Sequence, residues 1–279
     1  MAQAAQGGAA AAVGRRRPGL AHRSPRDAHH HGTDRRIDGT LRHRAWRPAG
    51  RPAAPVLNPP SACRPGRRAS RLVKAALGVG LEAVTQAGAD AAQLATVFTS
   101  SSGDGHNCHA LCEMLASDDR AVSPTRFHNS VHNAAAGYWG IATGAMAPSQ
   151  VLCAFDASFA AGLLEALAQV ATTNAAILLV SYDAEYPEPI FAKRPVPDAA
   201  GVALLLAPRR SDKSLAEMKV SLGETPNTPM SDAALESLRT GIPAMRALPL
   251  LARLARRQAG TVSLEYLAPL SLRVAVAPC

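Results

Sequence analysis

The segment that most constrains the fold is a run of seven mostly apolar residues, Ala176–Tyr182 (AILLVSY). The run does not alternate between apolar and polar positions, which is typical of a strand buried on both faces of a sheet. Such a strand needs a covering layer on each side, and helices are the usual covering layer. The rest of the sequence is therefore expected to supply helices for both faces.

Segments with helical and strand-like patterns alternate on both sides of this run. One helix is expected to begin after Ser70, which can cap its N-terminus, and to end at Gly88. The other expected helices are His106–Ala116, a segment around residues 131–141, Ala160–Ala171 and Ile242–Arg257. The other expected strands are Ala95–Ser100, Gln150–Phe155, Val202–Ala207, Met218–Leu222, Thr261–Leu267 and Leu272–Ala277. This alternation predicts a layered α/β fold with a mostly buried mixed sheet over residues 67–279.

Residues 1–66 differ from the rest of the chain in composition. Residues 1–70 contain 14 arginines, three aspartates and no lysine, a net charge of +11, whereas the remaining residues have a net charge of −2. The segment has no sustained periodicity, and nothing before residue 60 has the pattern of a strand, so a disordered Arg/Pro/Ala-rich tail is expected. A wrong start or a frameshift in GC-rich DNA is favoured. A genuine disordered tail, a transit peptide and a nucleic-acid-binding tail stay open.

Several classes of protein find no support in the sequence. There is no run of about 18 apolar residues that would predict a membrane span. Neither a phosphate-binding P-loop nor a strand-linked G-x-G-x-x-G is present, so no nucleotide cofactor is expected, and no other cofactor either. The cysteines are scattered and odd in number, which favours reduced thiols and a cytoplasmic location. They are Cys63, Cys108, Cys112, Cys153 and Cys279.

Histidines and cysteines gather in the segment that is expected to form a helix over residues 106–116. A zinc site would combine these residues with a second pair, but no C-x-x-C motif is present. Leu111 and Leu115 mark the same helix as a packing element. Buried thiols with hydrogen-bonded histidines are therefore favoured, and no metal site is expected. The residues that enter the zinc alternative are His106, Cys108, His109, Cys112, His128 and His132.

The stretch Ser123–Asn133 (SPTRFHNSVHN) is unusually polar for a segment beside an apolar helix. Its side chains offer both donors and acceptors, as a buried hydrogen-bond network requires. A structural network is favoured, and a pocket or a subunit interface is the alternative. The residues concerned are His128, Asn129, Ser130, His132 and Asn133.

The strand, turn and helix within residues 150–171 predict an elbow at the sequence Asp156-Ala157-Ser158-Phe159. A side chain at such an elbow lies near a helix N-terminus, which stabilises negative charge and activates a thiol or a hydroxyl. Phe159, which has neither group, is the residue expected there. Ser158 is adjacent, but the G-x-S-x-G pattern is absent, so a helix cap is the favoured role for its hydroxyl.

Three stretches together resemble successive landmarks of the N-terminal domain of β-ketoacyl synthases. They are Ser100–Gly105 (SSSGDG), Ser123–Gly144 (SPTRFHNSVHNAAAGYWGIATG) and Met146–Ala166 (MAPSQVLCAFDASFAAGLLEA). The likeness runs from about Pro60 to Cys279 and is greatest to the short ketosynthase-like or chain-length-factor-like subgroup. It implies a thiolase-like half-domain in which a first strand precedes the helix after Ser70.

The resemblance also implies what the chain lacks. The family motif D-T-A-C-S-S-S-L falls on Asp156–Leu163, so the position of the nucleophilic cysteine is Phe159. The family uses two later histidines, and this sequence has no histidine after His132. Cys153 lies on the preceding strand and is not a substitute by position.

The resemblance therefore implies a non-catalytic subunit rather than a condensing enzyme. Such a subunit pairs with a ketosynthase or with itself, contacts acyl carrier protein indirectly, and serves fatty-acid, polyketide or aryl-polyene synthesis. Phe159 would form a wall of the tunnel or of the interface. The alternative is an acyl transferase or hydrolase with Ser158 or Cys153 as its nucleophile.

Overall fold

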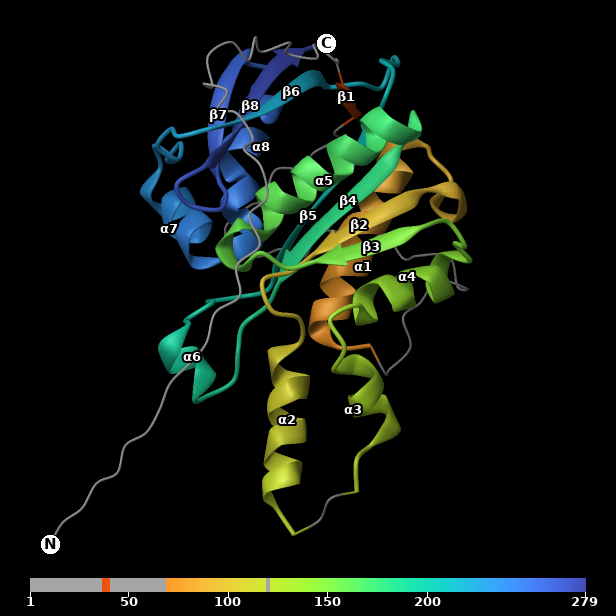
Figure 1. The fold of residues 1–279 in the computed structure, drawn as a ribbon, viewed down its shortest axis with the longest axis vertical. Coiled ribbons are helices and arrows are strands. Elements are labelled where there is room, and N and C mark those ends of the chain that lie inside the picture. The colour runs from red at the N-terminus through yellow and green to blue at the C-terminus, as the bar shows by residue number, and fades with distance from the viewer. Residues whose placement is uncertain (1–36, 41–68, 119–120) are drawn as a thin grey trace, which may run out of the picture. The chain divides into compact units, whose positions relative to one another are not determined.

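A computed structural model describes residues 37–40, 69–118 and 121–279 (Figure 1). The described residues form an eight-stranded sheet with the strand order β3-β2-β4-β5-β1-β6-β8-β7. Strands β2, β3 and β4 are parallel to one another, and the other neighbours are antiparallel. The strands are β1 (Ile37–Thr40), β2 (Ala95–Thr99), β3 (Ser149–Leu152), β4 (Ile177–Asp183), β5 (Ala200–Ala207), β6 (Ala216–Gly223), β7 (Gly260–Glu265) and β8 (Ser271–Pro278).

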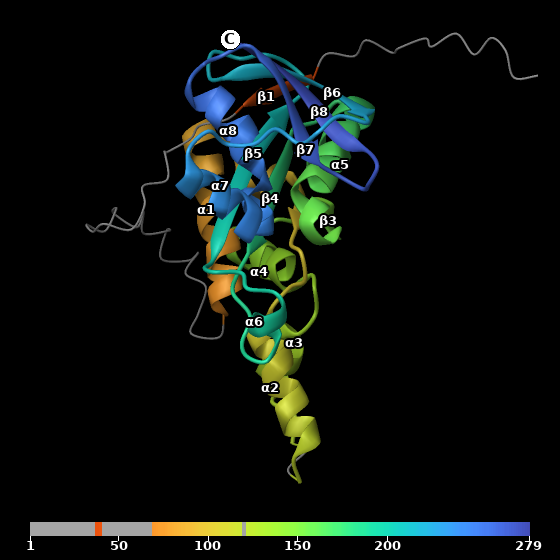
Figure 2. The same ribbon diagram turned by 90° about the vertical axis from the view of Figure 1, so that its left-hand side faces the viewer.

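Helices cover both faces of the sheet (Figure 2). The α-helices are α1 (Arg71–Ala87), α2 (Gly105–Ala116), α3 (Pro124–Asn129), α4 (Ala134–Thr143), α5 (Ser158–Thr173), α6 (Ile190–Lys193), α7 (Ala233–Gly241) and α8 (Leu248–Ala255). The 3-10 helices are η2 (Ala91–Gln93), η3 (Phe155–Ala157) and η4 (Pro243–Ala247). None of the helices in the described part of the chain is long and apolar enough to cross a membrane.

Strand β4 is buried along its whole length and divides the core into two clusters. Leu178, Val180 and Tyr182 pack in the cluster that contains α1 and α4. Ile177 and Leu179 pack on the other face in the cluster that contains α5, η4 and α8. Successive side chains of a strand point to opposite faces of a sheet, so each cluster receives every second residue. The layered α/β fold and the buried mixed sheet expected from the sequence are confirmed.

Helix α1 has the two end signals that its sequence predicts. The Ser70 hydroxyl accepts a hydrogen bond from the Val73 backbone N–H at 3.3 Å. At the other end, Gly88 adopts a left-handed conformation with φ of 66°. Glycine adopts this conformation without the steric cost that a Cβ atom adds, so it ends the helix efficiently.

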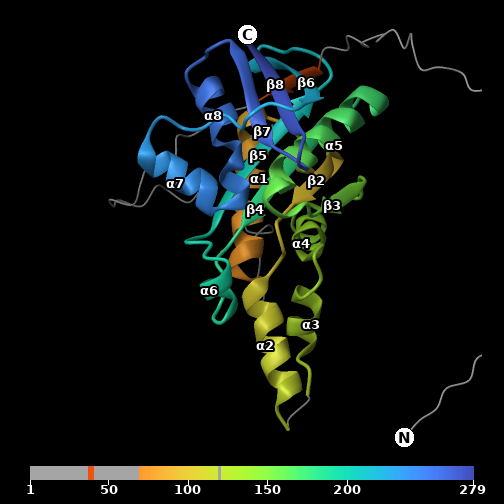
Figure 3. The same ribbon diagram turned by 60° about the vertical axis from the view of Figure 1, so that its left-hand side comes forward.

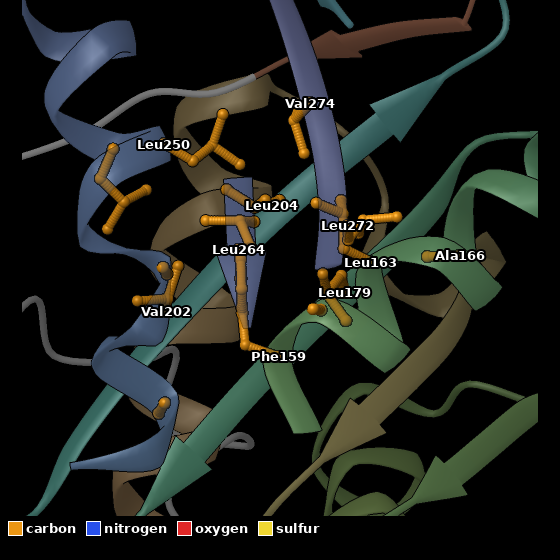
Figure 4. Close-up of a cluster of buried hydrophobic side chains, with 14 of the residues drawn as sticks. Phe159, Leu163, Ala166, Leu179, Val202, Leu204, Leu250, Leu264, Leu272 and Val274 are labelled. Atoms are coloured by element: carbon orange, nitrogen blue, oxygen red, sulfur yellow. The ribbon is translucent and has the colours of Figure 1, made fainter. Parts of the chain in front are cut away.

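Helix α5 lies directly on the sheet and orients the elbow that precedes it. A Cβ atom added at Gly162 would lie 2.2 Å from Thr99 Cγ2, so only glycine permits this close approach to β2. Phe159, Leu163 and Ala166 of α5 are fully buried, and Figure 4 shows them directed into the core. The position of α5 is therefore set by packing along its whole apolar face.

The structure corrects three expectations about elements. The expectation that no strand precedes residue 60 is wrong, because β1 pairs with both β5 and β6. Helix α7 was not expected. The helix expected over Ile242–Arg257 begins at Leu248 and follows η4, where Pro243 provides no backbone N–H donor. Apart from β1, the tail expected over residues 1–66 lies outside the described residues.

Helices α2 and α3 lie side by side and project away from the sheet (Figures 1 and 3). The Asp104 side chain caps α2 by accepting from the Asn107 backbone N–H at 3.0 Å. The Asn107 side-chain amide in turn donates to the Arg126 backbone carbonyl at 2.6 Å. The same residue therefore belongs to the first turn of α2 and connects α2 to α3.

Candidate functional site

The candidate site lies where the three parallel strands β2, β3 and β4 end. Their carboxyl ends meet at the same edge of the sheet, and this edge is where open α/β sheets most often bind ligands. The residues that follow the strands are Ser100–Gly105 after β2, Cys153–Ala157 after β3, and Asp183–Tyr186 at and after the end of β4. These three segments provide the polar side chains of the site.

The elbow between β3 and α5 is centred on Phe155. Phe155 has a φ of 53°, an uncommon backbone conformation for a residue other than glycine, and its side chain is 59% exposed. Phe159, in contrast, is fully buried in the core. The sequence predicts Phe159 both at the turn of the elbow and at the start of the following helix, whereas the structure places different residues at these two positions. The strained turn lies four residues earlier, and Phe159 lies in the first turn of α5.

The hydroxyl of Ser158 holds the elbow closed. Ser158 Oγ accepts from the Ala154 backbone N–H at 3.0 Å and donates to the Phe155 backbone carbonyl at 2.7 Å. The residue is fully buried. It is the first residue of α5 rather than the N-cap expected from the sequence, since Ala157 holds that position. Because both bonds lie within the turn, this hydroxyl is poorly placed to attack a substrate.

Cys153 is the thiol nearest to the elbow in the sequence. It follows β3 directly, and it is exposed and free. Its Sγ donates to the Ser101 backbone carbonyl at 2.9 Å, so the thiol lies against the loop after β2. The structure therefore provides an accessible thiol beside the elbow, two residues before the residue with positive φ.

Arg194 covers the elbow from outside. Its guanidinium carbon lies 3.6 Å from the centroid of the Phe155 ring. The same guanidinium donates to Asp156 Oδ1 at 2.6 Å. A cation over an aromatic face and an ion pair to the next residue both favour a fixed position of the Phe155 ring.

A second arginine connects the elbow to the C-terminal part of the sheet. Arg246 of η4 has only 9% of its side chain exposed, and its Nε lies 2.9 Å from Glu265 Oε2 of β7. One of its terminal nitrogens lies 3.6 Å from Asp156 Oδ2, and the other donates to the Arg239 backbone carbonyl. A buried arginine needs partners of this kind to offset its lost hydration. Asp156 is therefore held between two arginines from separate elements.

Asp183, at the end of β4, is a buried carboxyl group that the sequence did not single out. It accepts from the Ser101 backbone N–H at 2.8 Å and from Ser100 Oγ at 3.3 Å. Burial raises the pKa of Asp183 to about 6, although the hydrogen bonds from Ser101, Ser100 and the Ala244 backbone lower it in part. The sequence signal that marks it is a carboxylate directly after a continuous apolar strand.

Two further residues hold the loop after β2. The Tyr186 hydroxyl forms a hydrogen bond with Ser102 Oγ and lies 3.4 Å from Ser101 Oγ. His132 Nε2 lies 3.3 Å from the Ser100 carbonyl oxygen, which can only accept a hydrogen bond. Together with Asp183 and Cys153, these groups attach the loop to three different segments of the chain, which are the end of β4, the residue after β3 and the residues before α4.

The polar residues predicted within Ser123–Asn133 do not assemble into one pocket. Of the five, His132 is the one that reaches the loop after β2. The other four have separate positions: His128 packs edge-on against Tyr138, Asn129 is buried at the end of α3, Ser130 donates to the Phe127 carbonyl, and Asn133 precedes α4 without capping it through its side chain.

The residues of the zinc alternative are not brought together. Among the described residues, no group of three or more His, Cys, Asp or Glu side chains could hold a metal ion. The expectation of buried thiols in this segment is wrong, because Cys108 and Cys112 are both exposed on α2. The reason is that α2 projects from the body, which leaves Leu115 on the same helix 55% exposed.

These features define a layered α/β protein in which a strained elbow between a strand and a helix lies at the carboxyl edge of a mixed sheet. The family model described as "Beta-ketoacyl synthase, N-terminal domain" matches residues 43–263, more than half of the sequence. The chain therefore belongs to this family. No curated protein matches it.

Solved structures of similar fold include complexes of ketosynthases. The complex of a ketosynthase (ApeO) with its chain length factor (ApeC) from Xenorhabdus doucetiae matches with 23% identity and a TM-score of 0.57, over 75% of this chain and 79% of that chain. The ishigamide ketosynthase/chain length factor matches with 13% identity and a TM-score of 0.59, over 78% and 83% of the two chains. At these identities the likeness is one of fold, and it confirms the thiolase-like fold implied by the resemblance.

Proposed function

We propose that the chain is a non-catalytic, chain-length-factor-like subunit that pairs with a ketosynthase, or with a second copy of itself. The observation that carries the proposal is the elbow. The residue at its strained position is Phe155, whose ring lies against Arg194, and the nearest hydroxyl, that of Ser158, is fully engaged within the turn. A condensing enzyme needs a thiolate that can hold the acyl chain at such an elbow.

The sequence supports the same conclusion from outside the elbow. In a condensing reaction the extender thioester loses carbon dioxide, and the family uses two histidines for this step. Residues 133–279 contain no histidine. His132 Nε2 lies 3.3 Å from the Ser100 carbonyl oxygen, in the loop after β2.

An open strand edge supports the pairing with another subunit. Among the strands of residues 37–40, 69–118 and 121–279, β3 is the last one on its side of the sheet. The Pro148 carbonyl accepts from Thr96 of β2, and the Leu152 carbonyl accepts from Ser100, the residue after β2. Backbone groups of alternate residues point to the same side of a strand. Ser149 and Val151 therefore present their N–H and C=O groups outward, where a strand of another subunit can pair with them.

Exposed apolar side chains gather in the chain segment around this edge. Seven of the ten large exposed hydrophobic residues in the described part of the chain lie within residues 115–155. Ile141 of α4 is 75% exposed and Met146, just before β3, is 95% exposed. Helix α4, which carries Ile141, contacts β3, so Ile141 and Met146 favour an interaction surface at this strand edge. The seven are Leu115, Val122, Phe127, Val131, Ile141, Met146 and Phe155.

The pathway and the location follow from the proposed partner. A subunit that shapes the acyl chain of a ketosynthase acts in polyketide, aryl-polyene or fatty-acid synthesis in the cytoplasm. Acyl carrier protein would contact such a complex mainly through the ketosynthase. In this proposal Phe155 and Arg194 close the elbow region, and Phe159 has a packing role.

Co-expression of the full chain with a candidate ketosynthase tests the proposal. Light scattering should show a discrete one-to-one complex, and the chain alone should show no ketoacyl product from malonyl and acyl thioesters. Ketoacyl product from the purified chain would contradict the non-catalytic role. A monodisperse monomer that does not bind a co-expressed ketosynthase would contradict the subunit role.

A second candidate function is that of an acyl transferase with Cys153 as its nucleophile, because the Cys153 thiol is exposed. Incubation with an acyl thioester distinguishes the two. Acyl transfer predicts stoichiometric acylation of Cys153, detected by peptide mass spectrometry, followed by turnover. The subunit role predicts no turnover.

A further inference from the structure

Cys108 and Cys112 place two thiols on one face of α2. Residues four apart in a helix are neighbours on its surface, with Cβ atoms about 5–6 Å apart. Both residues are exposed. Helix α2 projects from the body of the protein, so both sulfurs are accessible to small ions from solvent (Figures 1 and 3).

The two thiols interact with each other. Cys108 and Cys112 lie about one helical turn apart on α2, and the proximity of Cys112 is one cause of the raised pKa of the Cys108 thiol. Desolvation raises the pKa of the Cys108 thiol, and the neighbouring Cys112 and Asp104 raise it further.

A disulfide is poorly suited to this pair. A disulfide usually requires Cβ atoms about 3.5–4.5 Å apart, which is shorter than the spacing of residues four apart in a regular helix. Formation of the bond would therefore distort the first turns of α2, where Asp104 and Asn107 connect the helix to its neighbours. A bridging atom between the sulfurs fits the intact helix better.

We propose that Cys108 and Cys112 form a dithiol site for one soft metal ion of the Cu(I) class. Soft thiolate ligands select Cu(I), whereas a structural zinc site needs four ligands, and no such set is assembled in the described part of the chain. As the ion binds, each S–H bond breaks and a sulfur–metal bond forms. Two protons pass to solvent, and no atom changes its oxidation state.

The other side chains of α2 are consistent with a site made by the thiols alone. His109 and Glu113 each follow one of the two cysteines, and they pair with each other, with His109 Nε2 3.2 Å from Glu113 Oε1. Cys153 donates to Ser101 O and is separate from the pair. The inference does not depend on the proposed function.

Anaerobic competition for Cu(I) with a chromophoric chelator tests the site on the full chain. Wild-type protein should bind one ion at this site, and Cys108→Ser and Cys112→Ser should each weaken its binding at least tenfold. Cys153→Ser is the matched control and should leave binding unchanged. Comparison among variants removes any contribution from the nine histidines of the chain. Affinity should rise with pH, because the metal competes with protons for both sulfurs.

A trivalent arsenical, which needs two adjacent thiols, provides the second measurement. Phenylarsine oxide should protect Cys108 and Cys112 together from maleimide, while Cys153 stays reactive, and circular dichroism should show that each serine variant keeps its helices. Equal copper affinity in wild-type protein and both serine variants would overturn the proposal. Independent maleimide labelling of Cys108 and Cys112 in the presence of the arsenical would also overturn it.

Discussion

The guanidinium of Arg194 lies 3.6 Å from the centroid of the Phe155 ring, directly over the residue with the strained backbone. This contact joins a short helix after β4 to the elbow after β3. Asp156 strengthens the connection, because it pairs with Arg194 at 2.6 Å. The elbow is therefore stabilised by partners from a different part of the chain.

Replacement of Arg194 by alanine should lower the free energy of unfolding by about 1–2 kcal/mol, since it removes a partly buried ion pair and a cation–π contact. Urea denaturation measures the change. Arg71→Ala is the matched control. Arg71 also pairs with two carboxylates, Glu185 and Asp198, but its side chain is 61% exposed, so a loss below about 1 kcal/mol is expected. Equal losses in the two variants would contradict the special role of Arg194.

Cysteine substitutions at the two phenylalanines should give opposite results in a Cys153→Ser background. Phe155→Cys should react readily with iodoacetamide, because the position is 59% exposed. Phe159→Cys should stay unreactive in the folded state and lower the free energy of unfolding by about 3 kcal/mol, because it creates a core cavity. Peptide mass spectrometry measures the labelling. Rapid labelling of Phe159→Cys would place the accessible elbow position at residue 159 instead.

Neither cysteine variant should condense malonyl and acyl thioesters. A thiol at residue 155 lies near the N-terminus of α5, which favours acylation by stabilising the thiolate. Decarboxylation of the extender still lacks the histidines that the family uses. One round of acylation without turnover is the expected result, and sustained ketoacyl formation would show that other groups supply this chemistry.

The parts of the fold that were predictable from the sequence depend on local signals. Ser70 and Gly88 mark the ends of α1, and the apolar run that forms β4 has no polar interruption. Strand β1 depends instead on its two neighbours. Its sequence IDGT contains a glycine and an aspartate, both of which are unfavourable in strands, and pairing with β5 and β6 overrides this preference.

The candidate site was predictable only in outline. The elbow between a strand and a helix follows from the sequence pattern, but the position of its strained residue depends on the register with which α5 packs. That register is set by contacts such as Gly162 against Thr99. Arg194 and Arg246 are distant in sequence from Asp156, so the ion pairs around the elbow leave no local signal.

Asp183 should make stability depend on pH. Its pKa is raised in the folded state to about 6 from a value of 3.8, so the folded state prefers the protonated form. Stability from this group is fully present below about pH 4 and is lost as the pH rises through about 6, a loss of about 3 kcal/mol. Between pH 4 and 7.5, wild-type protein should therefore lose about 3 kcal/mol more than Asp183→Asn. Parallel curves of unfolding free energy against pH would contradict this expectation.

Deletion of residues 1–66 should destabilise the protein, since it removes β1 from between β5 and β6. Gly39, for example, pairs with Leu206 of β5 on one side and with Ala216 of β6 on the other. Thermal unfolding should show a melting temperature lower by more than a few degrees. Deletion of residues 1–34, which retains β1, is the control and should change the melting temperature little. Equal stability of the two truncated proteins would contradict the role of β1.

Substitutions at the exposed apolar residues before β3 should separate association from folding. Met146 is 95% exposed and Ile141 is 75% exposed, so aspartate at either position costs little in the isolated chain, where the charge stays hydrated. In a complex the same charge would be buried without a partner, which costs several kcal/mol. Ile141→Asp and Met146→Asp should therefore reduce self-association, or binding to a co-expressed ketosynthase, by at least tenfold, with an unchanged melting temperature.

Leu222→Asp and Leu267→Asp are the matched controls and should associate like the wild type. These two residues are exposed apolar positions of β6 and of the loop between β7 and β8. Light scattering across a range of protein concentrations measures the effect. If all four variants associate equally well, the surface around β3 is not the interface, and the pairing proposed for this edge of the sheet fails.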